Sequence, residues 1–360
     1  MTNELYIIGL MSGTSLDGLD IAYCRFFYEG ESIRYELLAA ETTAYPDEWA
    51  RRLSSLDTSS ALEYALADVE LGHYFGRCVQ HFRARHPGRV DYIASHGHTI
   101  FHQPQRALTT QIGDGDAIAA ETRLPVISRF RNLDVALGGQ GAPLVPIGDK
   151  MLFSNYDACL NLGGFSNISF EAGGRRVAFD VSPCNMALNM LSAMNGKSYD
   201  MDGLMAHSGN VDGVLLSQLQ SLEYYALPAP KSLGREWFVE TFQPLLLNDA
   251  ISVEDRLCTV VEHVALQVSS VLSQHQLRTM IVTGGGAKNT YLVERFKALA
   301  PHCQITVPDV LVVDYKEALI FALLGYLRVL GITNTLRSAT GAVADSVGGV
   351  ISGIAPSAIS

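Results

Sequence analysis

The chain has 360 residues, of which 48% are hydrophobic and 18% charged, and its formal net charge at pH 7 is −11. This composition is typical of a folded globular protein and excludes a disordered chain. The length exceeds what one hydrophobic core usually spans, so we expect two domains. The negative charge repels nucleic acid and anionic lipid, and neither is an expected partner.

The six cysteines and the N-terminus indicate a cytoplasmic protein. The cysteines form no C-x-x-C pair and most lie in apolar runs, so they are interpreted as buried free thiols in a reducing compartment. The N-terminus has no basic region of a signal peptide. No run reaches the ~18 apolar residues that a membrane span needs.

The first half of the chain opens with three predicted strands at residues 5–10, 19–27 and 33–43, which suggest a β-meander. A long helix follows, because Ser60 and Glu63 have the spacing of a capping box and the helical pattern continues to residue 85. Further predicted elements are a strand at 92–95, a helix at 114–122 and a strand at 125–128.

The second half repeats this opening about 150 residues later. A strand at 157–162, a small-residue turn at 163–167 and strands at 168–170 and 177–181 predict a second meander. Helices dominate what remains: they are predicted at 213–222, 235–247, 253–276, 291–300 and 315–330, with strands at 279–282 and 304–307. We expect two lobes, residues 1–130 with 335–360 and residues 131–334.

Three glycine-containing turns are candidate phosphate sites: residues 12–18, 163–167 and 283–289. Tight turns present consecutive backbone N–H groups, and glycine lets an anion approach closely. The third turn separates a strand from a helix, whose N-terminus favours negative charge. None of them has the P-loop or the dinucleotide-binding spacing. An ordinary polar hairpin is the alternative interpretation of the first turn.

Several other polar residues are candidates for chemistry. Asp180 ends a predicted strand before a proline turn, so it is either a general base or a helix-capping aspartate. The histidines at 96, 98 and 102 suggest either a metal site or hydrogen-bonding roles at the edge of a cleft. Arg131 lies at the expected domain boundary, where ligand sites are common, and Glu317 begins an apolar helix.

Six ordered segments resemble the anhydro-N-acetylmuramic acid kinase family, at residues 12–18, 95–99, 138–144, 161–167, 231–236 and 283–289. The resemblance extends from about residue 6 to about residue 342. It implies the α/β fold of the actin-like ATPase, sugar kinase and Hsp70 superfamily. This is a two-domain, ribonuclease H-like fold with a duplicated mixed sheet and ATP in the interdomain cleft.

The resemblance also implies a reaction of peptidoglycan recycling. The family uses ATP and Mg²⁺ to open 1,6-anhydro-N-acetylmuramic acid by adding water at C1, and it phosphorylates O6. The products are N-acetylmuramic acid 6-phosphate and ADP. The partners implied are the two small-molecule substrates and a second copy of the chain in a homodimer.

Site residues follow from the same resemblance. Asp180 would be the catalytic base, and Asp17 would hold the metal ion through water. The sugar contacts would be His96, Arg131, Asn185 and Glu317. The ATP and phosphate contacts would be Gly13, Thr14, Ser15, Leu16, Asp17, Gly18, Leu19, Asp20, Gly163, Gly164, Gly284, Gly285, Gly286 and Asn289.

The sequence departs from the common family pattern at several positions. Where the family usually has Asp-Thr-Gly-Pro-Gly-Asn, this chain has Val181, Ser182 and Cys184 in place of the threonine and the two glycines. Arg129 stands where an aspartate is common, and Asp149 stands where a histidine is common. Three alternatives stay open. They are a kinase of another amino sugar on this fold, a non-catalytic ATP-binding sensor, and a histidine-based metallohydrolase that would carry zinc or manganese.

Overall fold

A computed structural model describes residues 4–13, 16–229 and 231–353. The chain forms two compact units: Met1–Leu152 with Tyr315–Ser360, here called unit 1, and Phe153–Asp314, here called unit 2. The sequence placed these divisions at 130/131 and 334/335. Residues 131–152 and 315–334 belong instead with unit 1, because the helices that they contribute pack on its sheet.

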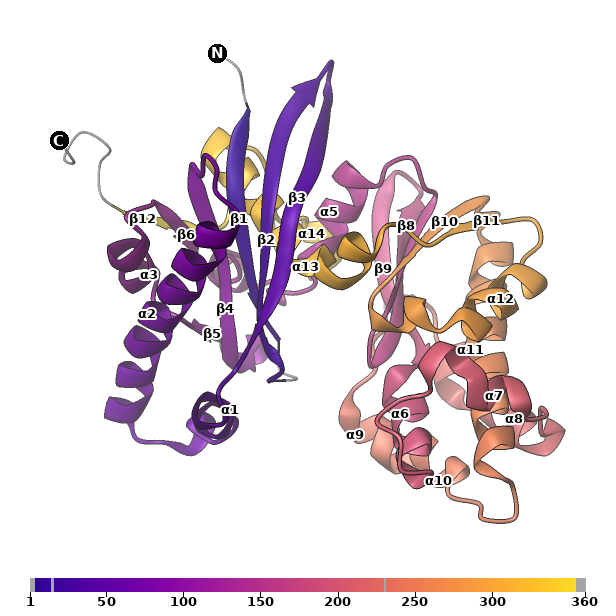
Figure 1. The fold of residues 1–360 in the computed structure, drawn as a ribbon. Helices are drawn as coiled ribbons and strands as arrows, with labels where there is room; N and C mark the ends of the chain where they lie inside the picture. The colour runs from indigo at the N-terminus through magenta and orange to yellow at the C-terminus, as the bar shows by residue number, and fades with distance from the viewer. Residues whose placement is uncertain (1–3, 14–15, 230, 354–360) are drawn as a thin grey trace. The chain divides into compact units, whose positions relative to one another are not determined.

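The sheet of unit 1 is mixed, with the strand order β12-β6-β4-β1-β2-β3 and with β5 paired to β4. β1 and β2 are antiparallel, as are β2 and β3, whereas β4 is parallel to β1 and β6 is parallel to β4. Figure 1 shows the long β2–β3 pair at one edge. The strands are β1 (Leu5–Ser12), β2 (Gly18–Glu29), β3 (Ser32–Ala44), β4 (Tyr92–Gln103), β5 (Leu108–Ile112), β6 (Val126–Ser128) and β12 (Val350–Ser352).

The core of unit 1 forms between this sheet and α2, which Figure 1 shows running along the strands. Leu71, Phe75, Val79 and Phe82 of α2 recur at helical spacing and are buried in one cluster with the sheet. The Ser60 side chain accepts a hydrogen bond from the Glu63 N–H and caps α2, as the sequence predicted. The helices of the unit are α1 (Asp47–Ser54), α2 (Ala61–Arg85), α3 (Gly115–Thr122), α4 (Asn132–Ala136), α5 (Val145–Leu152), α14 (Arg337–Thr340) and, from Tyr315 onward, α13 (Val310–Leu330).

Helix α13 approaches the same sheet closely through small residues. A Cβ atom on Gly9 of β1 would overlap the Ala318 carbonyl oxygen of α13, and one on Gly325 would lie 2.7 Å from the Ala94 Cβ. Helix and strand backbones can come this close only where side chains are absent or are single methyl groups. This contact fixes the neighbouring Lys316 and Glu317 along the sheet.

Unit 2 repeats the sheet topology of unit 1. Its order is β11-β10-β7-β8-β9: β7, β8 and β9 form an antiparallel meander, β10 is parallel to β7, and β11 is parallel to β10. The duplicated mixed sheet expected from the sequence is therefore confirmed. The strands are β7 (Ala158–Leu162), β8 (Phe165–Ala172), β9 (Arg175–Pro183), β10 (Thr279–Thr283) and β11 (Gln304–Thr306).

A separate hydrophobic core supports the second sheet. Helix α11 carries the largest share of it, with Val260, Val261, Val264 and Val268 fully buried against the strands. Ser252 caps α11 by accepting a hydrogen bond from the Asp255 N–H. The helices are α6 (Asn185–Met194), α7 (Leu204–Ser208), α8 (Gly213–Gln220), α9 (Arg235–Trp237), α10 (Gln243–Leu246), α11 (Val253–Gln274) and α12 (Thr290–Leu299).

Some predicted elements have different bounds. The strand expected at 92–95 continues to Gln103 and pairs with β5, so the histidine-rich segment lies on a strand. The helix expected at 235–247 is α9, a π-helical turn at Phe238–Phe242 and α10 in succession. The last long helix begins at Val310 and bends at Tyr315, where φ is −115°. No helix of the described residues is long and apolar enough to cross a membrane.

A buried ion pair joins α5 to α13. The Lys316 Nζ lies 2.7 Å from the Asp149 Oδ1, and each side chain is 5% exposed. Asp149 is one of the departures from the family pattern, and its charge is matched here by a cation. Removing one member of a buried pair leaves the other charge in a poorly solvated place.

We predict that Asp149→Asn lowers the free energy of unfolding by about 3–5 kcal/mol, because the Lys316 ammonium then remains buried without its counter-charge. Urea denaturation of the purified variants measures this. The matched control is Glu29→Gln, which removes an exposed ion pair of the same unit with Arg34 and is expected to cost under about 1 kcal/mol. Equal losses in both variants would contradict the prediction.

Candidate active site

In unit 2 the predicted phosphate turn and the later glycine triplet lie together. β10 pairs with β7 in parallel, so Thr283 is opposite Asn161 and the ends of both strands lie at the same edge of the sheet. A side chain on Gly284, whose φ is +81°, would overlap the Asn161 side chain and the Leu162 carbonyl. The close approach of these two segments therefore requires glycine.

The beginning of α6 packs on the same turn. The Asn185 Nδ2 donates to the Leu162 carbonyl oxygen at 3.0 Å, and the N–H of Asn185 donates to the Gly163 carbonyl at 3.1 Å. Asn185 was predicted to contact a sugar, and in the structure its carboxamide braces the glycine turn. Gly164 and Gly285 remain exposed beside it. As a result, the main chain at Gly164 and Gly285 is exposed at this edge of the sheet.

Asn289, predicted to contact ATP, has a structural role in this arrangement. Its Oδ1 accepts a hydrogen bond from the Leu292 N–H at 2.9 Å and caps α12. Its side chain is 8% exposed. The capping position places Asn289 at the end of the glycine segment, where the N-terminus of α12 adds positive potential.

Asp180 lies on β9 and is held by the backbone of a distant loop. Its Oδ2 accepts a hydrogen bond from the Leu233 N–H at 2.9 Å, and its own N–H donates to the Lys231 carbonyl at 3.2 Å. The Tyr224 hydroxyl donates to the Asp180 carbonyl at 2.6 Å. Burial raises the pKa of the Asp180 carboxyl, and the Leu233 N–H opposes this rise. Asp180 caps no helix here, so the capping alternative does not account for it.

In unit 1 the first glycine turn connects β1 to β2. The Leu16 N–H donates to the Gly13 carbonyl at 3.3 Å, Leu16 has a φ of +62°, and Asp17 is exposed. Thr14 and Ser15 lie outside the described residues. Gly18 has a φ of +157° and packs against the Thr43 carbonyl. Leu19 is fully buried in the core, so this residue offers no surface to a ligand in the structure.

The carboxylate of Asp20 continues this turn into a short hydrogen-bonded chain. The Thr42 hydroxyl donates to the Asp20 Oδ1 at 2.6 Å and lies 3.4 Å from the Tyr315 hydroxyl. Tyr315 is the residue at which α13 bends. Glu317 is exposed at the surface of unit 1. Desolvation by the surrounding protein raises the pKa of its carboxyl, Arg131 lowers it, and Asp20 raises it by charge repulsion. Asp17 and Asp20 therefore both place a carboxylate near the turn between β1 and β2.

Arg131 is oriented by His96 and by a loop carbonyl. The Arg131 Nε donates to the His96 Nε2 at 2.9 Å, and its Nη1 donates to the Gly141 carbonyl at 2.6 Å. Burial lowers the pKa of Arg131 to about 10, and Glu317 acts in the opposite direction. Of the predicted sugar contacts, His96, Arg131 and Glu317 therefore form one group within unit 1.

The histidine-rich strand does not assemble a metal centre. Within the described residues, no three His, Cys, Asp or Glu side chains are grouped so as to hold a metal ion. The His98 Nδ1 lies 2.8 Å from the Ser12 hydroxyl, and the His102 Nδ1 lies 3.1 Å from the Thr109 hydroxyl. These contacts support hydrogen-bonding roles for the histidines rather than a metal site. The metallohydrolase alternative therefore has no set of metal ligands among the described residues.

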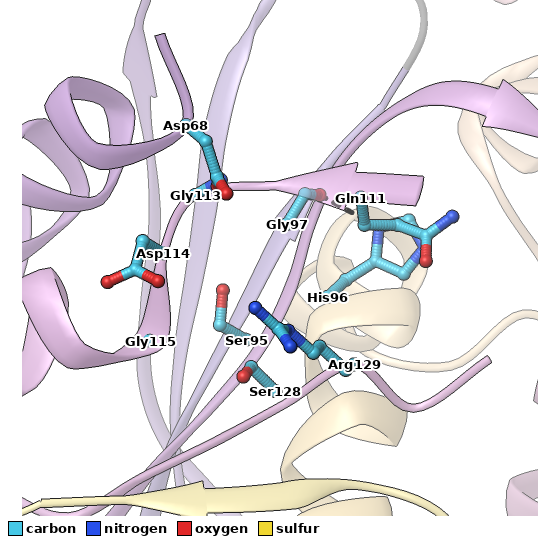
Figure 2. A pocket seen from close by; sticks show the side chains of 10 residues that line it. All are labelled: Asp68, Ser95, His96, Gly97, Gln111, Gly113, Asp114, Gly115, Ser128 and Arg129. Carbon is cyan, nitrogen blue, oxygen red and sulfur yellow. Dashed lines mark hydrogen bonds between the residues drawn. The ribbon is translucent and has the colours of Figure 1, made fainter. Parts of the chain in front are cut away.

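A small polar cavity adjoins His96, and Figure 2 shows the side chains that line it, including Asp68, Ser95, Ser128 and Arg129. Its volume is about 10 Å³, enough for one water molecule and far too small for a nucleotide or a sugar. Asp68 accepts a hydrogen bond from the Gly113 N–H at 2.8 Å, and Arg129 lowers its pKa against the larger effect of burial. We therefore do not assign substrate binding to this cavity.

We predict that His96 carries its proton on Nδ1 and stays neutral in mildly acidic solution. The Gly97 carbonyl can only accept from Nδ1, and the Arg131 guanidinium can only donate to Nε2. Burial and the positive charge of Arg131 both lower the pKa of the ring. Nitrogen NMR at pH 5.5 should show an unprotonated Nε2 in the folded protein and a protonated ring in urea. A charged ring in the folded protein would contradict this assignment.

Comparisons with known proteins agree over nearly the whole chain. A sequence model of the family described as Anhydro-N-acetylmuramic acid kinase matches residues 5–353. The chain is 37% identical to the enzyme of that name from Vibrio cholerae, over 94% of this chain and 95% of that protein. It is also 37% identical to the Pasteurella multocida enzyme, over 94% of each chain, and 35% identical to that of Pseudomonas syringae, over 97% and 99%. The chain belongs to the anhydro-N-acetylmuramic acid kinase family.

Proposed function

We propose that this protein is a kinase that opens 1,6-anhydro-N-acetylmuramic acid and phosphorylates its O6 with ATP. The products are N-acetylmuramic acid 6-phosphate and ADP, in the recycling of peptidoglycan in the cytoplasm. The observation that carries the proposal is the Asp180 carboxylate, which accepts a hydrogen bond from the Leu233 N–H and whose pKa is raised by burial. A protein that only sensed ATP would not need a positioned base.

Asp180 is the general base of this proposal. It takes a proton from a water molecule, the water oxygen bonds to C1 of the sugar, and the C1–O6 bond breaks. O6 then bonds to the γ-phosphorus, and the bond to the β-phosphate oxygen breaks to release ADP. A positioned carboxylate contributes about 10²–10⁴-fold to such a step. The hydrogen bond from Leu233 holds one carboxylate oxygen and so orients the other.

The phosphates of ATP are assigned to the glycine segments. In unit 2, exposed main chain at Gly164 and Gly285 lies beside the N-terminal end of α6, which suits a polyanion. In unit 1 the residues from Gly13 to Asp20 supply the second phosphate segment. Mg²⁺ typically binds through one or two carboxylates, water and the phosphates themselves. Asp17 and Asp20 match that donor set, and the ion would neutralise phosphate charge during transfer.

Arg131 and Glu317 are assigned to the sugar. Arg131 offers a fork of donors that His96 and Gly141 hold in place, and Glu317 can accept from sugar hydroxyls. His96 acts through Arg131 in this scheme and is a positioning residue. A kinase of another amino sugar would need the same base and the same phosphate segments, so substrate profiling decides between the two.

The phosphate assignment predicts that Gly285→Val raises the KM for ATP about tenfold or more without unfolding the protein. A Cβ at Gly285 would meet only the Asn185 Nδ2, at 3.9 Å, so the protein itself has room for a side chain that would exclude a phosphate. Kinetics and thermal melting measure the two effects. Gly213→Val is the control, since its Cβ would meet nothing within 4 Å. Unchanged ATP kinetics in Gly285→Val would contradict the assignment.

The general-base assignment predicts loss of turnover in Asp180→Asn, by about 10²-fold or more, with ATP binding retained. Asparagine can still accept the Leu233 hydrogen bond, so the loop should keep its place. In the wild type, kcat/KM should fall as the pH drops through the raised pKa of Asp180, because only the deprotonated form accepts a proton. Asp212→Asn, at the cap of α8, is the matched control and should keep full activity.

Product analysis in ¹⁸O-labelled water tests the reaction itself. One ¹⁸O atom should appear on C1 of the phosphorylated sugar and none in the transferred phosphoryl group. Phosphorylation of a different amino sugar, with the anhydro sugar left intact, would contradict the substrate. Full activity of Asp180→Asn would remove Asp180 from the mechanism.

A further inference from the structure

An open groove lies in unit 2 next to Asp180. Its volume is about 570 Å³, within the range of small-ligand sites. Seven residues line it: Glu223, Tyr224, Leu227, Pro228, Lys231, Ser232 and Trp237. Lys231 and Ser232 belong to the 231–236 segment of the family resemblance, to which the reaction described above gives no ligand.

The walls of this groove and the Asp180 carboxylate are parts of one hydrogen-bonded assembly. Tyr224 donates its hydroxyl proton to the Asp180 carbonyl, the Lys231 carbonyl accepts from the Asp180 N–H, and the Leu233 N–H donates to the carboxylate. These contacts fix the groove and the base relative to each other. A ligand in the groove would therefore have a set position with respect to the base.

Lys231 gives the groove a cation. Its Nζ donates to the Tyr224 carbonyl at 3.1 Å and lies 4.6 Å from the centroid of the Tyr224 ring. An ammonium group has three donors, and the carbonyl occupies one of them. The other charged residue of the lining is Glu223, whose side chain is exposed. The opposite charges of Lys231 and Glu223 cancel over the groove as a whole. A carboxylate of a ligand therefore meets a counter-charge only beside Lys231.

The aromatic residues supply the rest of the recognition surface. The rings of Tyr224 and Trp237 lie with centroids 5.5 Å apart and planes inclined by 51°. Trp237 is half-buried and Tyr224 is 5% exposed. Large rigid rings offer apolar contact area together with a polar edge. Such a surface suits a ligand that has both C–H groups and one anionic group.

We propose that this groove is the subsite for the D-lactyl carboxylate of the sugar, with the Lys231 ammonium as its counter-charge and Trp237 against the neighbouring C–H groups. The inference rests on the proposed function, because the lactyl ether is what distinguishes a muramic acid from the corresponding glucosamine. It makes Lys231 a specificity-determining residue for the acid-bearing sugar.

The test compares binding of 1,6-anhydro-N-acetylmuramic acid and its lactyl methyl ester, which has nearly the same shape without the charge. Calorimetry with the full chain and a non-hydrolysable ATP analogue gives both dissociation constants. The wild type should bind the acid about tenfold or more tightly than the ester, since a hydrogen bond to a charged group is lost. Lys231→Met should bind the two alike, whereas Lys197→Met, an exposed lysine of the same unit, should keep the preference.

The outcomes separate this inference from the function on which it rests. A wild type that binds the acid and the ester equally, or a Lys231→Met variant that keeps the preference, overturns the subsite. Phosphorylation of the anhydro sugar by the wild type would stand in either case. A wild type that fails to phosphorylate the acid overturns the proposed function instead. Thermal melting and circular dichroism of Lys231→Met verify that the variant is folded.

Discussion

The parallel pairing of the first strand with the fourth, repeated in both units, is the constraint on which the candidate site depends. β1 pairs with β4 and β7 pairs with β10, so the turn after the first strand lies beside the fourth strand, at His98 in unit 1 and at the end of β10 in unit 2. Residues far apart in the chain meet there: Leu162 with Gly284 in unit 2, and Ser12 with His98 in unit 1. The candidate site residues of each unit gather at one edge of its sheet for this reason.

Main-chain atoms of the loop around Lys231, together with the Tyr224 hydroxyl, position Asp180 in unit 2. Asp180 is bound through its carboxylate, its N–H and its carbonyl to the loop around Lys231 and to Tyr224. The residues at positions 181, 182 and 184 can therefore vary without loss of these hydrogen bonds of Asp180. These three residues lie in the protein interior, where each is at most 3% exposed.

In unit 1 the charges are arranged in pairs whose members come from separate elements. Lys316 pairs with Asp149, while the next residue, Glu317, interacts with Arg131. Both depend on the close contact of α13 with β1, which glycine at position 9 permits. The helix thus carries a buried ion pair and a carboxylate that interacts with Arg131 on adjacent residues, and a shift of the helix would disturb both.

Much of this protein was determined by local sequence signals. The strand periodicity, the capping box at Ser60 and the small-residue turns predict two similar meanders and their phosphate segments, because these signals act over a few residues. Tertiary structure alone decided the rest. Asp180 meets Leu233 across 53 positions and His96 meets Arg131 across 35, and no local pattern encodes such pairings. It also gave Asn185 its bracing role, since that side chain bonds to the Leu162 carbonyl 23 positions away, whereas Asn289 caps α12 through a local hydrogen bond from the Leu292 N–H.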